Sequence, residues 1–258
     1  MTTRDTPWRD GTPCWADLGA PDVAKAREFY SDVFNWTVQP GGPESGGYSV
    51  AELNGRGVAG VGPKMSPPEA PTMWMTYLAT SDADATAAKI KGAGGQLVME
   101  AMDVMDVGRM AVAVDPAGAV FGIWQAGAFP GAQIVNEPGA MSWNEQMSRD
   151  FEGSKAFYAA VFHYEYGDMS GDGFSYATVK VDGRDVGGIG DLHAGVPAGT
   201  PAGWRVYFGA ADTDASVARV QANGGSIIRE PVDHPYGRMS TVADDQGAVF
   251  SLLAVTPG

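Results

Sequence analysis

Cysteine is almost absent from this sequence, and so are long apolar stretches. The single Cys14 among 258 residues excludes an intrachain disulfide framework, and we interpret it as a small buried hydrophobe rather than a nucleophile. The opening residues contain no apolar stretch of the kind that a secretory signal has, so a cytoplasmic location is expected. No run approaches the roughly 18 apolar residues that a membrane-spanning helix needs. The sequence therefore predicts a cytoplasmic protein that does not span a membrane.

Basic residues are also scarce. Lys and Arg number 17 against 31 Asp and Glu, which gives a formal net charge of −14. Phosphate groups are repelled by such a chain, so neither nucleic acid nor an anionic membrane is an expected partner. Hydrophobic residues make up 44% of the chain, which is enough to build a folded core. These numbers predict a globular protein.

What the sequence does contain is an internal repeat. The segment from Trp15 to Trp36 returns at a constant offset of 128 as the segment from Trp143 to Tyr164, and later pairs keep offsets between 128 and 130. Such self-similarity is the signature of a tandem duplication. We place the first domain at 1–126, a Gly- and Pro-rich linker at 127–140 and the second domain at 141–258.

Within each half, strand and helix signals alternate. Asp22 can cap a helix whose apolar residues recur with helical spacing, and Asp82–Ala93 reads as a second helix that Gly94 ends. Short alternating runs punctuated by turn signals such as Asn54-Gly55 read as strands. The resulting order is a βαβββ module that occurs twice per half, which makes an α+β fold of four modules.

Four such modules, with Phe29-Tyr30 in the first helix, Gly94-Gly95 after the second and an Asp-x-x-Gly turn before the last strand, resemble the vicinal oxygen chelate superfamily. This superfamily comprises glyoxalase I, bleomycin-resistance proteins and extradiol dioxygenases. The chain length, together with a Gly-Arg pair before the fourth strand of each half, looks most like a two-domain actinobacterial subgroup. This subgroup includes a mycobacterial antigen and proteins often labelled hydroxylases. The resemblance implies that each pair of modules curls into a cup of mixed β-sheet, an incomplete barrel.

The resemblance also implies a divalent metal inside each cup, held by His, Gln or Glu. The family's spacing places the three shared ligand positions on residues that are poor ligands: Trp15, Thr76 and Gly122 in the first half, and Trp143, Val206 and Ser251 in the second. A further position falls on Ala51 or Glu52, and on Val179 or Lys180. A single carboxylate such as Glu52 does not hold a metal. We therefore expect no cofactor, and a divalent metal finds no support at these positions.

The three histidines of the chain are not predicted to form a metal site. His163 follows the first helix of the second half, His193 lies in a Gly- and Pro-rich loop, and His234 lies in a loop that can overhang a cup. They do not share a strand or helix at ligand spacing. We interpret them as exposed residues, with His234 as the candidate exception.

Strand parity indicates which residues occupy the cups instead, since residues i and i+2 share a face. Asp17 projects with Trp15, and Glu145 projects with Trp143. The predicted ligand-binding residues are aromatic side chains with one acid per half: Trp15, Asp17, Tyr48, Trp74, Thr76, Trp124, Trp143, Glu145, Tyr176, Trp204 and His234. The bland alternative is that the aromatic residues are ordinary core. Arg109 and Arg238 could also neutralise the two acids.

Two functions of different classes follow. The first is a metal-independent binding module that stacks a flat, aromatic or cationic small molecule between indoles, as the resemblance to bleomycin-resistance proteins implies. The second is an enzyme, a glyoxalase-type lyase or isomerase or an oxygenase, with non-standard ligands or with Asp17 or Glu145 as general base. The binding module is the favoured interpretation. Either a monomer or a homodimer is compatible with two fused halves.

Overall fold

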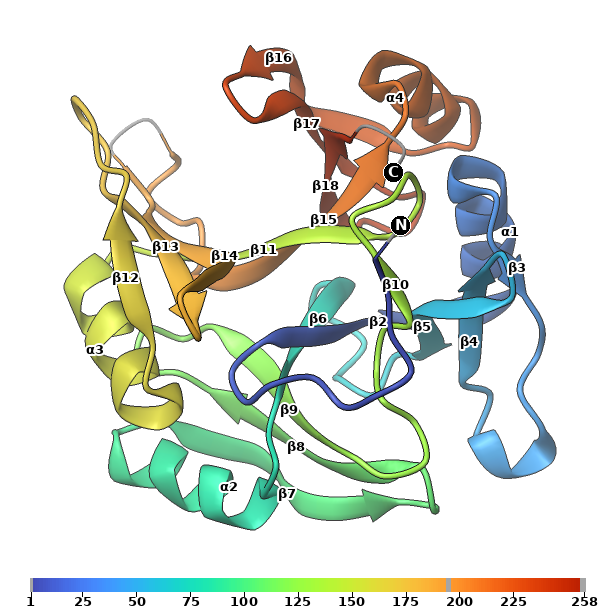
Figure 1. Cartoon of the computed structure of the whole chain (residues 1–258). Coiled ribbons are helices and arrows are strands. Elements are labelled where there is room, and N and C mark those ends of the chain that lie inside the picture. The colour runs from blue at the N-terminus through green and yellow to red at the C-terminus, as the bar shows by residue number, and fades with distance from the viewer. Residues whose placement is uncertain (1, 194–195, 256–258) are drawn as a thin grey trace.

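The computed structural model describes residues 2–193 and 196–255 of the chain. Each half forms one mixed sheet of eight strands, and the two sheets meet at a bridge between Met73 and Val249 (Figure 1). Neither sheet closes into a barrel. The predicted α+β fold with a duplicated pair of βαβββ modules is confirmed.

The first half contains two helices and eight sheet strands. Its elements are β2 (Pro13–Ala20), α1 (Val23–Phe34), β3 (Thr37–Val38), the 3-10 turn η1 (Pro43–Ser45), β4 (Ser49–Leu53), β5 (Arg56–Pro63), β6 (Met73–Ala79), α2 (Ala83–Gly92), β7 (Gln96–Val104), β8 (Gly108–Val114) and β9 (Val120–Ala126). Their order across the sheet is β3-β4-β5-β2-β6-β9-β8-β7. The first strands of the two modules, β2 and β6, lie antiparallel at its centre.

The second half repeats this arrangement. Its elements are β11 (Met141–Ser148), α3 (Phe151–Phe162), β12 (Glu165–Asp168), β13 (Tyr176–Val181), β14 (Arg184–Asp191), β15 (Gly203–Ala210), α4 (Thr213–Ala222), β16 (Ser226–His234), β17 (Gly237–Ala243) and β18 (Val249–Ala254). The strand order is β12-β13-β14-β11-β15-β18-β17-β16, with β11 and β15 antiparallel at the centre. A short pair, β1 (Thr2–Thr3) with β10 (Ile134–Val135), ties the N-terminal segment to the linker.

Local sequence signals explain where the helices begin and end. An aspartate accepts hydrogen bonds from first-turn amides at the start of every helix: Asp22, Asp82, Asp150 and Asp212. Helices α1 and α3 end at Asn35 and His163, both in the left-handed conformation with a φ of 59°. His163 is exposed and holds a helix terminus, as its repeat mate Asn35 does.

The hydrophobic cores do not follow the boundary between the halves. Helix α1 packs beside α4 and helix α2 beside α3, as Figure 1 shows. Accordingly, the ring centroids of Phe34 in the first half and Phe208 in the second are 5.0 Å apart, and those of Phe121 and Tyr158 are 5.5 Å apart. Each sheet thus belongs to one half, whereas each of the two cores combines residues from both halves.

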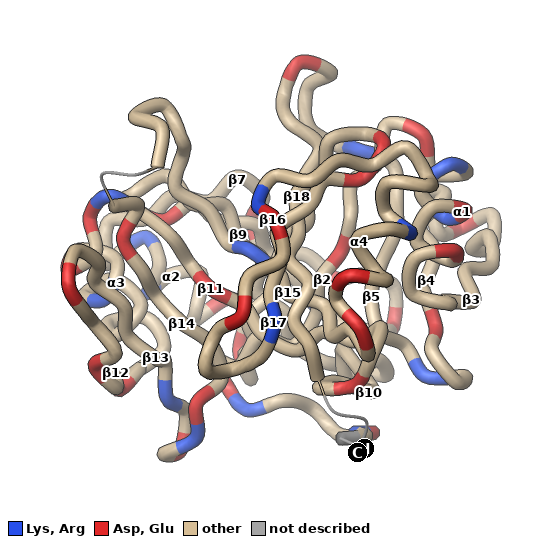
Figure 2. The backbone as a smooth tube through the Cα atoms, turned by 90° about the horizontal axis from the view of Figure 1, so that it is seen from above, with Lys and Arg blue, Asp and Glu red and all other residues tan. Residues whose placement is uncertain are grey.

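Acidic residues outnumber basic residues in the chain by 31 to 17. Acidic positions occur over both halves in Figure 2, in keeping with the net charge of −14. Among the described residues, no helix is both long enough and apolar enough to cross a membrane.

Candidate functional site

Strand register defines one cup per half. In the first sheet Trp15 pairs with Tyr77, and Tyr77 pairs with Gly122, so these three positions share one face with Asp17. In the second sheet Trp143, Tyr207 and Ser251 take the same places, with Glu145 as the acid. We call the faces that carry these residues the first cup and the second cup.

The acid of the first cup is held by two tyrosines. The hydroxyl of Tyr77 donates to Asp17 Oδ2 at 3.1 Å, and the hydroxyl of Tyr48 reaches the same oxygen at 3.4 Å. Trp15 Nε1 donates to the Tyr48 hydroxyl at 2.8 Å. The chain of donors therefore runs from an indole through a phenol to a carboxylate.

The second cup repeats this network with a longer acid. Tyr207 donates to Glu145 Oε1, and Tyr176 reaches Oε2 at 3.3 Å. Trp143 Nε1 donates to the Tyr176 hydroxyl at 2.9 Å. Because the same three contacts recur in both halves, they are a property of the repeated module.

Burial makes both acids weak. Loss of hydration raises the pKa of Asp17 to about 7, although the Tyr77 and Tyr48 hydroxyls oppose the change. Burial likewise raises the pKa of Glu145, against the Tyr207 hydroxyl and the positive charge of Arg205. A carboxyl group whose pKa is raised in a cleft is able to hold a proton or to accept one.

The two arginines that could have neutralised these acids lie elsewhere. Arg109 pairs with Asp84 and Asp103 at 2.9 and 2.8 Å, and Arg238 makes the equivalent pairs in the second half. Asp17 and Glu145 are therefore balanced by hydroxyl groups rather than by these guanidinium groups.

Three of the predicted cup residues, and Val206 with them, lie on the other face of the sheet. Trp74 pairs with Leu18 and donates to the Tyr30 hydroxyl at 2.9 Å, under helix α1. Trp204 donates to the Tyr158 hydroxyl at 2.8 Å in the same manner, and Thr76 bonds Asn144. The prediction that these side chains line the cups is wrong. The residues that face the cups are Tyr77 and Tyr207 rather than Thr76 and Val206. Because side chains alternate between the two faces of a strand, an error of one residue places a side chain on the opposite face.

The residues that sequence reasoning missed stand one position later. Tyr77 and Tyr207 face the cups, and they recur at an offset of 130, the same offset that relates Trp74 to Trp204. That recurrence of a polar aromatic residue was the available signal. Trp15, Asp17, Tyr48 and Trp124 are grouped in the first cup as predicted, and Trp143, Glu145 and Tyr176 in the second.

The corrected positions do not fit the metal of the family. The shared ligand places hold Trp15, Tyr77 and Gly122 in the first cup and Trp143, Tyr207 and Ser251 in the second, and neither set offers imidazole or carboxylate. Among residues 2–193 and 196–255, no three His, Cys, Asp or Glu side chains are grouped as ligands. Cys14 is buried, which raises the pKa of its thiol well above the usual range.

A cleft of about 420 Å³ opens onto the second cup. It is lined by Glu145 and Tyr176 from the network, by Met147, by Phe174 in the turn before β13, and by the charged or titratable residues Asp172, Asp191, His193, Arg229 and His234. His234 therefore overhangs a cup, as predicted. Phe174 is 46% exposed, and within residues 2–193 and 196–255 the buried Asp191 Oδ1 has no hydrogen-bond partner.

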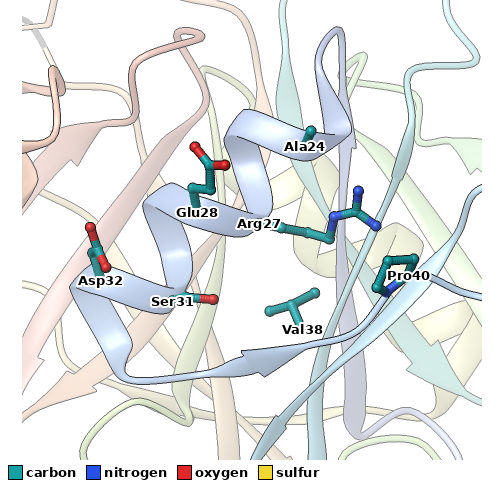
Figure 3. A pocket seen from close by; sticks show the side chains of 7 residues that line it. All are labelled: Ala24, Arg27, Glu28, Ser31, Asp32, Val38 and Pro40. Carbon is teal, nitrogen blue, oxygen red and sulfur yellow. The ribbon is translucent and has the colours of Figure 1, made fainter.

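A second hollow on the surface lacks these features. It measures about 500 Å³ and lies between α1 and β3. Figure 3 shows Arg27 pointing toward Pro40, while Glu28 and Asp32 project from the helix away from Val38. Its polar groups do not converge, so the second cup is the better candidate site despite its smaller volume.

Comparison with known proteins agrees with this fold. The model of the Glyoxalase/Bleomycin resistance protein/Dioxygenase superfamily matches residues 15–123 and 140–252, and the chain belongs to that superfamily. The chain is 40% identical to the Putative glyoxylase CFP32 of Mycobacterium tuberculosis, with 97% of both chains covered. It is 36% identical to the anthracycline biosynthesis protein DauV of Streptomyces sp. (strain C5), with 96% of this chain and 94% of that protein covered.

Among solved structures, the Mn(II)-bound glyoxalase from Novosphingobium aromaticivorans shares the fold. The TM-score is 0.66 at 17% identity, over 95% of this chain and 82% of the other. At this identity the likeness concerns the fold alone. The residues at the ligand positions of this chain are those described above.

Proposed function

We propose that the protein binds a flat aromatic small molecule in the second cup, without a divalent metal. The observation that carries the proposal is the open cleft that is lined by the aromatic residues Phe174 and Tyr176 and by the carboxyl group of Glu145. Exposed aromatic faces bind flat ligands by stacking, which contributes on the order of 1–3 kcal/mol per ring. The other side chains that line the cleft include Asp172, Asp191, Arg229 and His234, which suit a ligand with polar substituents.

The acids of the cleft indicate which substituents. Asp191 Oδ1 has no hydrogen-bond partner among the residues that the structure describes, and an unpaired buried oxygen gains a bond when a ligand donates to it. Glu145 accepts from two phenols and keeps a position for a third donor. A ligand with hydroxyl or ammonium donors at its edge suits this pair. The relative named an anthracycline biosynthesis protein supports the proposal, since anthracyclines are flat polycyclic molecules with such groups.

A titration tests the proposal with two probes. One is an anthracycline with an ammonium group, and the other is 1,4-dihydroxyanthraquinone, which is flat and uncharged. We expect both to quench tryptophan fluorescence saturably, because Trp143 is bonded to Tyr176 in the cleft wall. Phe174→Ala should weaken both probes about 5- to 50-fold through lost stacking.

The acid has a matched control in the repeat. Glu145→Gln should weaken the charged probe about tenfold more than the uncharged one, because the carboxylate attracts the ammonium group. Asp17→Asn makes the same change in the first cup and should leave both affinities as they are. If neither probe binds, or if binding is indifferent to both Phe174→Ala and Glu145→Gln, the proposal fails.

A second candidate function is acid-base catalysis on the bound molecule. The specific observation in its favour is the raised pKa of Glu145 beside two phenols in an accessible cleft. An enzyme of this kind would exchange or move a proton next to a carbonyl group of its ligand. Incubation in D₂O of an anthracycline whose side-chain ketone carries α C–H bonds, followed by return of O–H and N–H groups to H₂O and mass spectrometry, distinguishes the two functions. Deuterium uptake at carbon that Glu145→Gln abolishes indicates catalysis, and unchanged probe indicates binding.

A further inference from the structure

The linker enters the first cup through the side chain of Phe129. Its ring lies edge-on to Trp15, with the centroids 4.9 Å apart, and 6.2 Å from the ring of Trp124. On the strand beyond, a Cβ added at Gly57 would stand 3.5 Å from Phe129 Cε2. The phenyl ring, which is partly buried, therefore packs against residues of β2, β9 and β5 in the first cup.

Hydrogen bonds on both sides hold this segment in place. Trp124 Nε1 donates to the carbonyl oxygen of Phe129 at 3.1 Å, and the amide of Phe129 donates to Val107 at 3.0 Å. Further along, the amide of Gln133 donates to Gly57 at 2.8 Å, and the Gln133 side chain accepts from the Gly57 amide at 3.0 Å. The backbone is thus fixed to two edges of the cup, with Phe129 directed between them.

The residues of the second cup are more exposed than their counterparts in the first cup. Trp15, Tyr77 and Trp124 are 5%, 4% and 8% exposed, whereas their counterparts Trp143, Tyr207 and Leu253 are all partly exposed. The repeat also differs at Gly57, whose counterpart Asp185 carries a side chain paired with Lys180 at 2.9 Å. By the repeat offset, the counterpart of Phe129 is residue 258, which lies outside the described residues.

We propose that the first cup is a latent site for a single aromatic ring, filled in the native protein by its own Phe129. Its walls already bind a phenyl group edge-on to one indole and near a second, which is the favoured geometry of aromatic pairs. Removal of the ring leaves an apolar hollow, and hollows of that kind bind small aromatic molecules. The corollary that the native chain takes a flat ligand at the second cup alone rests on the proposed function.

The experiment uses the full chain with Phe129→Ala and toluene, which has the size and shape of the lost side chain. We expect the Tm to fall by about 5–10 °C without toluene, since truncation removes the contacts of the partly buried Phe129 ring with Trp15 and Trp124. Toluene at several times its Kd should restore about 2–4 °C. Wild-type protein should not respond. Phe151→Ala removes a half-buried Phe outside the cups, and toluene should not restore its Tm either.

The location of the bound toluene is read from indole N–H resonances. Those of Trp15 and Trp124 should shift on toluene addition to Phe129→Ala, while that of Trp143 stays in place. Phe129→Leu provides a smaller truncation in case the alanine variant does not fold, with a smaller fall in Tm and smaller shifts of the same two resonances. A folded variant whose Tm toluene leaves unchanged overturns the proposal, as does a shift confined to Trp143. These outcomes do not depend on whether the second cup binds anything.

Discussion

The hydroxyl of Tyr30 in α1 donates to Asp244 Oδ2 in the last turn of the second half, at 2.9 Å. The reciprocal contact joins Tyr158 of α3 to Asp115 in the last turn of the first half, at 3.0 Å. Both aspartates also accept from amides of their own turns, such as those of Ala248 and Ala119. Two equivalent buried hydrogen bonds thus connect halves that the strand pairing keeps almost separate.

These contacts predict that the two halves unfold together. Tyr30→Phe and Tyr158→Phe should each lower the free energy of unfolding by about 1–3 kcal/mol, because each leaves a buried carboxylate with one donor fewer. Urea unfolding measures the change, and calorimetry should give a single transition because each core combines modules of both halves. Tyr236→Phe is the control, since Tyr236 is 65% exposed. Two separate transitions would contradict the shared cores.

The two cups should respond differently to loss of their first tryptophan. Trp15→Ala should lower the free energy of unfolding by about 3–5 kcal/mol and leave probe affinity unchanged, because the Trp15 ring is enclosed by Phe129. Trp143→Ala should weaken the flat probes by about 1–3 kcal/mol, because Trp143 supports Tyr176 in the cleft wall. If both variants lose stability and neither changes affinity, both rings are core and the second cup is not the binding site.

Much of the architecture could be predicted because it depends on local signals that occur twice. The capping aspartates, the turn glycines and the offset near 128 determine helix starts and strand order in each half. The faces of Trp74 and Trp204 could not be predicted as safely, because a shift of one residue in a strand reverses the face. The position of Phe129 could not be predicted at all: it depends on the path of a linker that matches no repeat.

The residues at the family's ligand positions predict that the protein does not retain a divalent metal. Protein purified without added metal, then offered zinc, nickel and ferrous iron, should keep well below one equivalent of each after desalting. Indole, phenol and hydroxymethyl groups from Trp143, Tyr207 and Ser251 do not form a stable site for these ions. Elemental analysis measures the content. Stoichiometric retention that His234→Ala abolishes would mean that the histidine over the second cup is a ligand.

The raised pKa of Asp17 has a consequence for stability against pH. Its carboxyl titrates near 7 in the folded protein and near 3.8 as an ordinary aspartate, so the folded state holds the proton more tightly. Asp17 therefore increases the free energy of unfolding below about pH 4, and this stabilising contribution is lost as the pH rises to about 7. Asp17→Asn cannot ionise, so the variant should gain stability relative to wild type across that window and keep a constant difference above it. Urea unfolding at about pH 5 and pH 8 measures the change.

Asp84→Asn is the control with the opposite sign. The guanidinium of Arg109 lowers the pKa of Asp84, so this carboxyl group stabilises the folded protein only when it is ionised. The variant should therefore lose stability relative to wild type at neutral pH, by a small amount because the pair is exposed to solvent, and the loss should vanish as the pH falls below about 4. The free energies of unfolding of Asp17→Asn and wild type could instead differ by a constant amount between about pH 4 and pH 7, while Asp84→Asn behaves as described. In that case Asp17 is ionised in the folded protein over this whole pH range. The phenol network would then stabilise the ionised carboxylate and keep its pKa low. Glu145, which has equivalent phenol partners, would then be too weak a base to be a good candidate for a general base.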